Sequence, residues 1–505
     1  MATKALFNSV VNWFIRQRKD QIEHFKQYPQ ETQEELLFSQ MFYAEDTEYG
    51  RKYGFSSISN YKDFQKKVPI VSYEDFEPYI EKARQGQKDV FWPGVIKQFA
   101  KSSGTTNAKS KYIPITVESL EDCHYKAGKD LISIYVNNHP ESELFQHKNL
   151  RLGGSAEMYQ DFNTKFGDLS AILIDNLPFW VEIINTPCKK TSLMSEWESK
   201  MKAIISEVRN EDVGSLTGVP SWMMVLLQRT LQETGKNNIS ELWPNLEVFF
   251  HGGISFKPYK NQYKEIIGKD IRYYEIYNAS EGFFAIQDQA GSDEMLLMLD
   301  YGIFYEFIPM EDFHAGSREA IPISGVELNK NYAVVITTNG GLWRYLIGDT
   351  VRFTSISPYR IKISGRTKHY INAFGEELMI DNVETALKIA CEKLNVSISD
   401  YTGAPVFMTN QNKGSHEWIF EFTKEPNDIQ EFSSIFDSAL KTLNSDYEAK
   451  RYNDITLKAP IIHLAKPNLF YEWMASRGKL GGQNKVPRLS NDREYIDPLL
   501  LLNKA

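Results

Sequence analysis

The stretch KSSGTTNAKSKYIPIT, residues 101–116, concentrates small polar residues in a way that no folded core favours. Its candidate binding residues are Ser102, Ser103, Gly104, Thr105, Thr106 and Lys111. Backbone N–H groups around a glycine, neighbouring hydroxyls and one ammonium can together surround the oxygens of a polyphosphate. The stretch lacks the Gly-Lys-Ser/Thr ending of a P-loop. Composition alone fits a phosphate-binding loop and an ordinary Ser/Thr-rich surface turn equally well.

Four later stretches have the pattern of strands and their turns. LEVFFHGG (246–253) predicts a buried strand that ends at two glycines, and IRYYEIYNASEGFFAI (271–286) predicts a strand, a tight polar turn and a second apolar strand. YAVVITTNGGLWRYLIGDTVRF (332–353) predicts strands joined by an Asn-Gly-Gly hairpin, and YRIKISGRTKHYI (359–371) continues the sheet. Because helical patterns alternate with these strands, the sequence predicts an α/β protein.

The chain of 505 residues is long enough for two or three domains. After about residue 368 the pattern changes to two predicted helices, Asn382–Leu394 and Ile429–Leu443, with strand-like stretches around them. A unit of about 135 residues has the size of an independent domain. We therefore predict a large N-terminal α/β domain over residues 1–367 and a smaller, mobile C-terminal α+β domain over residues 368–505.

Charge and cysteine content argue against several classes of function. The chain has 57 basic and 66 acidic residues, and its net charge of −9 argues against a general nucleic-acid or anionic-membrane surface. The three cysteines are far apart and show no metal-ligand spacing, which fits a reducing compartment without a disulfide framework. We expect a cytoplasmic monomer without nucleic-acid or membrane partners.

The first 25 residues share some features with a targeting segment. Their apolar residues recur at helical spacing between polar ones, and no small-residue cleavage site follows. We interpret the segment as an amphipathic helix packed on the body of the protein rather than as a helix on a membrane surface. No run approaches the roughly 18 apolar residues of a spanning helix.

Two further turns carry candidate binding residues. In YNASEG (277–282), Glu281 offers a carboxylate to Mg²⁺, which prefers oxygen ligands, and Tyr277 offers a ring for stacking on a base. In GLWRYLIGD (341–349), Asp349 follows an apolar strand, and an aspartate at the carboxyl end of a strand can accept both hydroxyls of a ribose. Taken singly, a buried tyrosine, a helix-capping glutamate and a turn aspartate explain these residues equally well.

The order of these motifs resembles that of the adenylate-forming superfamily, which includes acyl-CoA synthetases, nonribosomal adenylation domains and firefly luciferase. The details are most similar to the auxin-responsive Gretchen Hagen family of acyl acid amido synthetases, and the resemblance spans nearly the whole chain. The matching residues are Ser102, Ser103, Gly104, Thr105, Lys111 and Pro114 in the phosphate loop, Tyr277, Ser280, Glu281 and Gly282 in the second motif, and NKVPR (484–488) in the Lys-x-Pro-Arg loop.

The resemblance implies an adenylate-forming fold, ATP and Mg²⁺ as cofactors, and a role for each matching residue. The catalytic residues would be Lys111, Glu281 and Lys485, with Glu281 binding Mg²⁺ and Lys485 carried into the site by the small domain. The ATP-binding residues would be Ser102, Ser103, Gly104, Thr105, Thr106, Gly252, Gly253, Tyr277, Asn278, Ala279, Ser280, Asp349, Arg366 and Lys368. Among these, Asp349 would hold the ribose and Lys368 would mark the hinge between the domains.

One position departs from the family. Plant members have a lysine after the Gly-Arg motif, and Glu377 aligns with it here. The phosphate contact of that lysine is therefore not implied for this chain, and Lys485 or Lys479 would supply the charge.

The acyl pocket is the most variable part of such enzymes, so the resemblance does not identify the acid or the amine. Aromatic and sulfur-containing residues could line the pocket or simply belong to the core. The residues in question are Phe179, Trp180, Met223, Phe250 and Phe256. His251, before the two glycines, is interpreted as a packed strand-end histidine rather than a base.

The implied reaction has two steps: transfer of AMP onto a carboxylic acid with loss of pyrophosphate, and attack on the acyl-adenylate by an amine, expected to be an amino acid. Lys111, Lys485 and Mg²⁺ on Glu281 would neutralise the triphosphate. Two alternatives remain open. An acyl-CoA ligase shares the first step but needs a basic groove that the sequence does not show. A non-catalytic homologue would keep the fold, although the retained Lys111, Glu281 and Asp349 argue against it.

Overall fold

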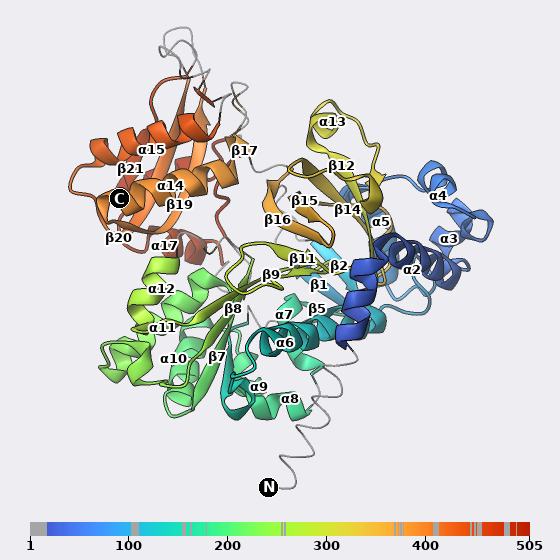
Figure 1. Ribbon diagram of the computed structural model, residues 1–505, viewed down its shortest axis with the longest axis horizontal. Helices are drawn as coiled ribbons and strands as arrows, with labels where there is room; N and C mark the ends of the chain where they lie inside the picture. The colour runs from blue at the N-terminus through green and yellow to red at the C-terminus, as the bar shows by residue number, and fades with distance from the viewer. Residues whose placement is uncertain are drawn as a thin grey trace.

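The computed structural model of the chain describes most of its length (Figure 1). The described residues are 18–102, 111–153, 158–161, 164–177, 179–253, 256, 259–367, 370–371, 373, 376, 378–407, 414–444, 447–448, 451, 457–478, 485–490 and 492–504. Within these ranges, no helix has both the length and the apolar character needed to cross a lipid bilayer. Of the amphipathic helix expected at the N-terminus, residues 18–27 are helical and the earlier part lies outside the described residues.

A twelve-stranded mixed sheet forms the centre of the molecule, with the strand order β13-β12-β14-β15-β16-β11-β10-β9-β8-β7-β3-β6. Its strands are β3 (Lys148–Arg151), β6 (Asn185–Thr186), β7 (Val213–Gly218), β8 (Val248–Gly252), β9 (Arg272–Ala279), β10 (Gly282–Ile286), β11 (Met295–Leu297), β12 (Ile303–Pro309), β13 (Ile321–Pro322), β14 (Asn331–Thr338), β15 (Tyr345–Ile356) and β16 (Tyr359–Arg366). The strands from β6 to β9 pair in parallel, and the rest pair antiparallel. The carboxyl ends of the parallel strands therefore share one edge, where α/β sheets bind ligands.

Apolar residues on both faces explain the parallel half of this sheet. All of β8 is buried, and its aromatic residues favour a strand that is covered on both sides. Phe249 and Trp243 belong to a core cluster formed with the helices α10 (Trp197–Val208), α11 (Pro220–Thr234) and α12 (Lys260–Ile267). Phe250 points to the opposite face, where its ring lies 5.4 Å from that of Tyr135 on α6 (Lys126–Asn138). The two faces are thus packed against different sets of helices.

A smaller four-stranded sheet, of order β2-β1-β5-β4, carries the stretch that opened the sequence analysis. Its strands are β1 (Gln98–Ser102), β2 (Lys111–Ile115), β4 (Tyr159–Asp161) and β5 (Thr164–Gly167). β1 and β2 are antiparallel, with Ser102 opposite Lys111, so the candidate phosphate loop is the connection of this hairpin. Thr116 then caps the following helix, because its hydroxyl accepts the N–H of Ser119 at 3.0 Å. The helix begins as the π-helical segment η2 (Ser119–Tyr125) and continues as α6 (Lys126–Asn138).

Further helices cover the two sheets. They are α2 (Pro29–Ala44), α3 (Glu48–Tyr53), α4 (Tyr61–Lys67), α5 (Tyr73–Arg84), α7 (Leu169–Asp175), α8 (Phe179–Ile184), α9 (Lys189–Ser192), α10 (Trp197–Val208), α11 (Pro220–Thr234), α12 (Lys260–Ile267) and α13 (Met310–His314), with the 3-10 turns η1 (Phe55–Ser57), η3 (Leu144–Gln146), η4 (Ile239–Glu241) and η5 (Ile323–Gly325). Local sequence sets several boundaries. Ser72 and Asp75 form a capping box at the start of α5, and Gly54 ends α3 at a φ of 64°.

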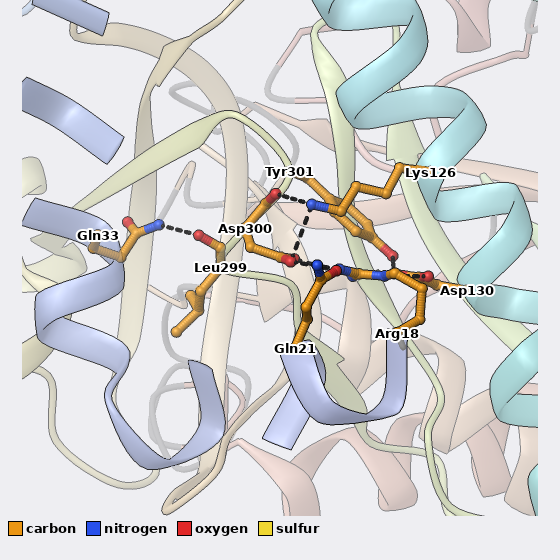
Figure 2. A network of polar contacts seen from close by, with 8 residues as sticks. All are labelled: Arg18, Gln21, Gln33, Lys126, Asp130, Leu299, Asp300 and Tyr301. Carbon is orange, nitrogen blue, oxygen red and sulfur yellow. Dashed lines mark hydrogen bonds and ion pairs between the residues drawn. The ribbon is translucent and has the colours of Figure 1, made fainter. Parts of the chain in front are cut away.

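A buried polar network joins the N-terminal helix to α6 and to the central sheet (Figure 2). The Arg18 guanidinium lies 2.6 Å from Asp130 and 2.9 Å from Asp300, and Lys126 lies 3.0 Å from Asp300. Tyr301 donates a hydrogen bond of 2.7 Å to Asp130, whose side chain is fully buried. Loss of Arg18 would leave the buried carboxylate of Asp130 without its cationic partner. It is therefore expected to lower the free energy of unfolding by about 3–5 kcal/mol.

The strands after residue 367 form separate sheets, drawn in orange beside α11 and α12 in Figure 1. The elements are β17 (Tyr370–Ile371), β18 (Leu378–Met379), β19 (Ser397–Val406), β20 (Ser415–Lys424), β21 (Ile461–Leu464), α14 (Ile380–Leu394), α15 (Ile429–Leu443), α17 (Leu469–Ser476) and α18 (Ile496–Lys504). Trp418 and Phe420 of β20 pack on Phe436 of α15 in the core of this unit. Both helices expected here are present: α15 has the predicted bounds and α14 begins two residues earlier.

β14 and β15 form the expected hairpin around the Asn-Gly-Gly sequence, because the two strands are antiparallel neighbours. Residues 339–344 join them in a loop longer than a two-residue turn. Gly341 adopts a φ of 88°, and Trp343 is fully buried with its indole N–H donating to the carbonyl of Phe91 at 2.9 Å. Burial of this large side chain between the sheet and the N-terminal helices overrides the turn preference of the Asn-Gly-Gly sequence.

Candidate functional site

Asp349 is the centre of a polar cluster at the junction of β9, β15 and β16. The Tyr277 hydroxyl donates a hydrogen bond of 2.7 Å to Oδ2 of Asp349, and Nε of Arg366 lies 2.9 Å from Oδ1. Burial, reinforced by the negative charge of Asp349, raises the pKa of Tyr277 well above its ordinary value. Each oxygen of Asp349 keeps a further lone pair, so the carboxylate can still accept hydroxyl donors from a ligand.

The expected position of Asp349 at the carboxyl end of a strand is wrong. The residue lies inside β15, near its beginning, directly after Gly348 with a φ of 91°. The register of β14 and β15 shifts between Ala333 and Val335, opposite this segment, as in a β-bulge. The bulge, rather than a strand end, therefore presents Asp349 to Arg366, its partner residue on β16.

Tyr277 is more enclosed than a stacking platform requires. Its side chain is 5% exposed, and its ring lies 4.7 Å from that of Phe284. The structure therefore gives Tyr277 a clear role as the donor that orients Asp349. Stacking of a base on its ring stays a prediction.

Glu281 occupies the tight turn between β9 and β10, with Ser280 before it. Its side chain is half-buried, and burial raises its pKa. The positive charges of Lys111 and Arg366 oppose that shift, whereas Asp349 adds to it. One carboxylate in this turn thus faces two cations and one anion, which come from the three strands β2, β16 and β15.

Lys111 begins β2, at the base of the candidate phosphate loop. Its ammonium lies 5.5 Å from the centre of the Tyr73 ring, within cation–π range. The Tyr73 hydroxyl accepts the backbone N–H of Tyr112 at 2.9 Å, which fixes the ring beside the strand. Helix α5 therefore positions the lysine through Tyr73, a contact that the sequence did not reveal.

Two glycines stand at the end of β8, and the first allows close approach of the neighbouring strand β9. A Cβ on Gly252 would lie 2.5 Å from the carbonyl oxygen of Ile276 and 3.3 Å from Oδ1 of Asn278. Gly253 adopts a φ of 81°. Before them, the ring of His251 stacks on Phe256 with centroids 4.2 Å apart, and burial lowers its pKa to about 3. His251 is therefore a neutral, packed residue, in line with its interpretation as part of the strand end.

Lys485 reaches this edge from the last part of the chain and donates a hydrogen bond to the carbonyl oxygen of Gly253. Burial lowers its pKa to about 7, and the positive charges of Arg366 and Arg488 act in the same direction. Asp400 and Asp349 oppose the shift. The lysine therefore belongs to the same electrostatic environment as the carboxylate of Asp349, although it comes from a distant part of the sequence.

Several of the binding and pocket residues predicted from the sequence are not described by the structure. Ser103, Gly104, Thr105, Thr106 and Lys368 lie outside the described residues, as do Glu377, Lys479 and the side chains of Ser102, Phe179 and Trp180. Met223, Phe250 and Phe256 are all buried within core clusters. In the described part of the chain, no group of three or more histidine, cysteine, aspartate and glutamate residues gathers closely enough to hold a metal ion alone.

The residues that hold Lys485 in place were missed by sequence reasoning. Arg488 forms an ion pair with Asp400 and donates a hydrogen bond of 3.0 Å to the hydroxyl of Tyr259. Its guanidinium also lies 4.5 Å above the ring of Tyr401. Arg488 belongs to the NKVPR motif, so the sequence indicated that this position matters. No motif indicated that Asp400 and Tyr259 are its partners.

Three domain models of one protein family match successive parts of the chain. The GH3 family N-terminal domain matches residues 18–271, the GH3 family central domain residues 296–366, and the GH3 family C-terminal domain residues 381–494. A curated relative, the probable indole-3-acetic acid-amido synthetase GH3.1 of Arabidopsis thaliana, is 22% identical over 560 residues, covering 95% of this chain and 92% of its own.

Two solved structures resemble the fold. GH3.15 acyl acid amido synthetase has a TM-score of 0.79 at 17% identity, with 96% of this chain and 95% of that chain covered. A 2-hydroxyisobutyryl-CoA ligase, in the postadenylation state with 2-HIB-AMP, has a TM-score of 0.60 at 14% identity, with 93% and 91% covered. The predicted fold class, an α/β adenylate-forming fold with a large N-terminal and a smaller C-terminal part, is confirmed.

Proposed function

The chain belongs to the GH3 family, and we propose that it is an ATP-dependent acyl acid amido synthetase. It adenylates a carboxylic acid with release of pyrophosphate. It then transfers the acyl group to the amino group of an amino acid. One observation carries this proposal. Lys485, from the C-terminal unit, lies against Gly253 at the sheet edge that also presents Glu281 and Asp349.

The nucleotide is held by groups whose charges suit its parts. Asp349, oriented by Tyr277 and Arg366, accepts hydrogen bonds from the ribose hydroxyls. Lys111 stabilises the triphosphate, with the hydroxyl-rich loop before it supplying further donors. Gly252 and Gly253 lack side chains that would fill the space beside the adenine.

Glu281 fits a site for Mg²⁺. It is a half-buried carboxylate near the candidate phosphate loop, and its raised pKa shows that its environment does not fully compensate its charge. Since no cluster of carboxylates surrounds it in the described residues, the phosphates and water would provide the other ligands. When bound, the ion would neutralise charge on the departing pyrophosphate.

Lys485 supplies positive charge to the first step. Adenylation needs the acid's carboxylate and the α-phosphate, both anions, to approach each other, and an ammonium held at the site lowers that repulsion. Its low pKa in the free protein is raised when an anionic nucleotide binds beside it. The lysine is then protonated at the point where its charge is used.

We place the domain boundary between residues 367 and 368, with Lys368 at the hinge. This is supported by the sheet topology, because β16 is the last strand of the central sheet and ends at Arg366. Rotation of residues 368–505 would withdraw Lys485 after the first step and admit the amine. We propose that the enzyme acts as a cytoplasmic monomer, in line with its net charge and separate cysteines.

An acyl-CoA ligase shares the first step, so the acceptor distinguishes the two functions. Incubation of the protein with ATP, Mg²⁺, a panel of acids and an equimolar mixture of amino acids and CoA, followed by mass spectrometry, identifies the product. Acyl-amino acids support the amido synthetase. Acyl-CoA as the main product would overturn the proposed second step while leaving adenylation in place.

A further inference from the structure

Arg151, the last residue of β3, is a half-buried cation. Its Nε is fully buried and has no hydrogen-bond partner. No carboxylate of the described residues lies within 4.0 Å of its guanidinium. An arginine keeps its charge at any ordinary pH, so this arrangement leaves desolvated positive charge uncompensated.

The other arginines show that this state is exceptional. Every other described arginine that is buried or half-buried has a carboxylate oxygen within 4.0 Å. Such carboxylates raise the pKa of Arg360 and Arg366. Burial instead lowers the pKa of Arg151 to about 10. Among the described arginines that are buried or half-buried, Arg151 is thus the one without a carboxylate partner.

Arg151 lies at the same edge and on the same face of the sheet as the nucleotide site. It is opposite Thr217 of β7, and Thr217 is opposite Phe250 of β8, two residues before Gly252. Residues two apart on a strand share a face. Since neighbouring strands are about 4.8 Å apart, Arg151 lies two strand spacings, about 10 Å, from the strand of Gly252. One small substrate, or two that react with each other, can span that distance.

The face around Arg151 is built for polar contact. Oδ1 of Asn149, two residues earlier, accepts hydrogen bonds from the hydroxyls of Ser215 at 3.0 Å and Thr217 at 2.9 Å. Tyr125 of η2 and Glu182 of α8 are the ionisable groups whose charges act on Arg151. Glu182 is the carboxylate among them, and it makes no ion pair with Arg151, so its charge compensates the guanidinium only at a distance.

We propose that Arg151 binds a substrate carboxylate that does not react, forming a second anion site at the edge of the nucleotide pocket. A planar carboxylate can accept two parallel hydrogen bonds from a guanidinium. Two sources share this chemistry: the α-carboxylate of the acceptor amino acid, and a second carboxylate on the acyl acid. The identity of the substrate rests on the proposed function, whereas binding of a carboxylate at Arg151 does not.

Paired substrates distinguish the two sources. In the first arm, hydroxylamine replaces the amino acid, and KM is measured for phthalate against benzoate with wild type and Arg151→Gln. In the second arm, amide formation is measured with L-amino acids against the corresponding amino acid amides. Loss of one charge-assisted pair should raise KM about 10- to 100-fold for the partner that carries the extra carboxylate, and leave its neutral counterpart unchanged. The arm that responds identifies the source.

A binding measurement keeps the test independent of turnover. Thermal unfolding is followed with ATP and either L-glutamate or phthalate, for wild type and Arg151→Gln. Stabilisation of wild type that is lost in the variant supports the anion site even if no acid is adenylated. Equal shifts in both proteins, or none, together with unchanged KM values, would overturn it.

Two controls separate binding from a structural role. Arg209→Gln removes an exposed arginine that has no carboxylate of the described residues within 4.0 Å, and should change neither KM nor thermal stability. Arg151→Gln itself should not lower the melting temperature, because no ion pair is lost. If Arg151→Gln, Glu182→Gln and the double variant all lost the same amount of stability, the two residues would form a structural pair. That result would contradict the proposal.

Discussion

Arg488 donates a hydrogen bond of 3.0 Å to the hydroxyl of Tyr259, and so joins the loop that carries Lys485 to the segment that precedes α12. The same hydroxyl donates to the carbonyl of Ser399 at 3.0 Å, and Gln262 of α12 donates to the carbonyl of Ile398 at 2.9 Å. All of these contacts link the large N-terminal part to β19 or to the Lys485 loop. They hold the lysine at Gly253, which is the arrangement that we propose for adenylation.

Removal of these contacts should slow the first step and spare the second. Tyr259→Phe loses two hydrogen bonds and Gln262→Ala loses one, and each is worth about 0.5–1.5 kcal/mol. We expect acyl-adenylate formation to slow about 3- to 10-fold. Amide formation from an acyl-adenylate added directly should keep its wild-type rate, because that step does not use the Lys485 position.

Tyr263→Phe is the matched control. Tyr263 lies on α12, next to Gln262, and its hydroxyl donates to the carbonyl of Pro220 at 2.7 Å, entirely within the N-terminal part. The variant should lower stability without changing the ratio of the two step rates. If Tyr259→Phe slowed both steps equally, these contacts would not be specific to adenylation.

The pKa of Lys485 predicts the pH dependence of ATP use. In the free protein, burial lowers the pKa of Lys485 to about 7. The role proposed for this lysine requires its ammonium form. The value of kcat/KM for ATP, which reports the free enzyme, should therefore fall as pH rises above about 7. The decline in kcat should occur at higher pH, because bound phosphate raises the pKa.

Lys485→Arg supplies the control, since a guanidinium stays charged throughout this range. The variant should lose the alkaline decline in kcat/KM even if its rate is lower. A wild-type profile that stays flat from pH 6 to pH 9 would argue that Lys485 does not supply the charge.

Glu281→Gln should abolish activity without loss of stability. Loss of the metal-binding carboxylate is expected to slow adenylation on the order of 100-fold or more. Because folding raises the pKa of Glu281, its ionised form opposes folding once the pH exceeds its unfolded pKa. At pH 7 the melting temperature of the variant should therefore equal or exceed that of wild type. A variant with full pyrophosphate release would show that Glu281 is not the metal ligand.

Gly252→Ala should damage the nucleotide site through sterics. The new methyl group would lie 2.5 Å from the carbonyl oxygen of Ile276, which is backbone and cannot move freely. We expect a loss of about 1–3 kcal/mol in unfolding free energy and a higher KM for ATP. Gly128→Ala on α6 is the control, because nothing lies within 4 Å of its Cβ position. That variant should be neutral or slightly stabilised.

The sequence predicted those parts of the fold that depend on local pattern. The strand LEVFFHGG and the helix Ile429–Leu443 follow from runs of apolar residues and their spacing, and both are present. The turn between β14 and β15 could not be predicted in this way. Its conformation depends on burial of Trp343 under helices that lie more than 250 residues earlier.

In the candidate site, too, the sequence predicted the residues that stand in motifs but not the contacts that depend on tertiary packing. Short motifs identified Glu281, Asp349 and Lys485, because each stands in a recognisable run of residues. Their partners have no such motif: Asp400 reaches Arg488 only through the packing of β19 against the final loop. The bulge that presents Asp349 arises from strand register, which no single stretch of sequence specifies.

The most direct test of the central claim is pyrophosphate release from ATP and Mg²⁺ across a panel of aryl, indole and fatty acids, with hydroxylamine present to trap the acyl-adenylate. The account predicts acid-dependent pyrophosphate with a matching acyl-hydroxamate for at least one acid, and loss of both in Glu281→Gln. ATP binding without pyrophosphate release for any acid of a broad panel would contradict it, and would indicate a nucleotide-binding protein that does not adenylate.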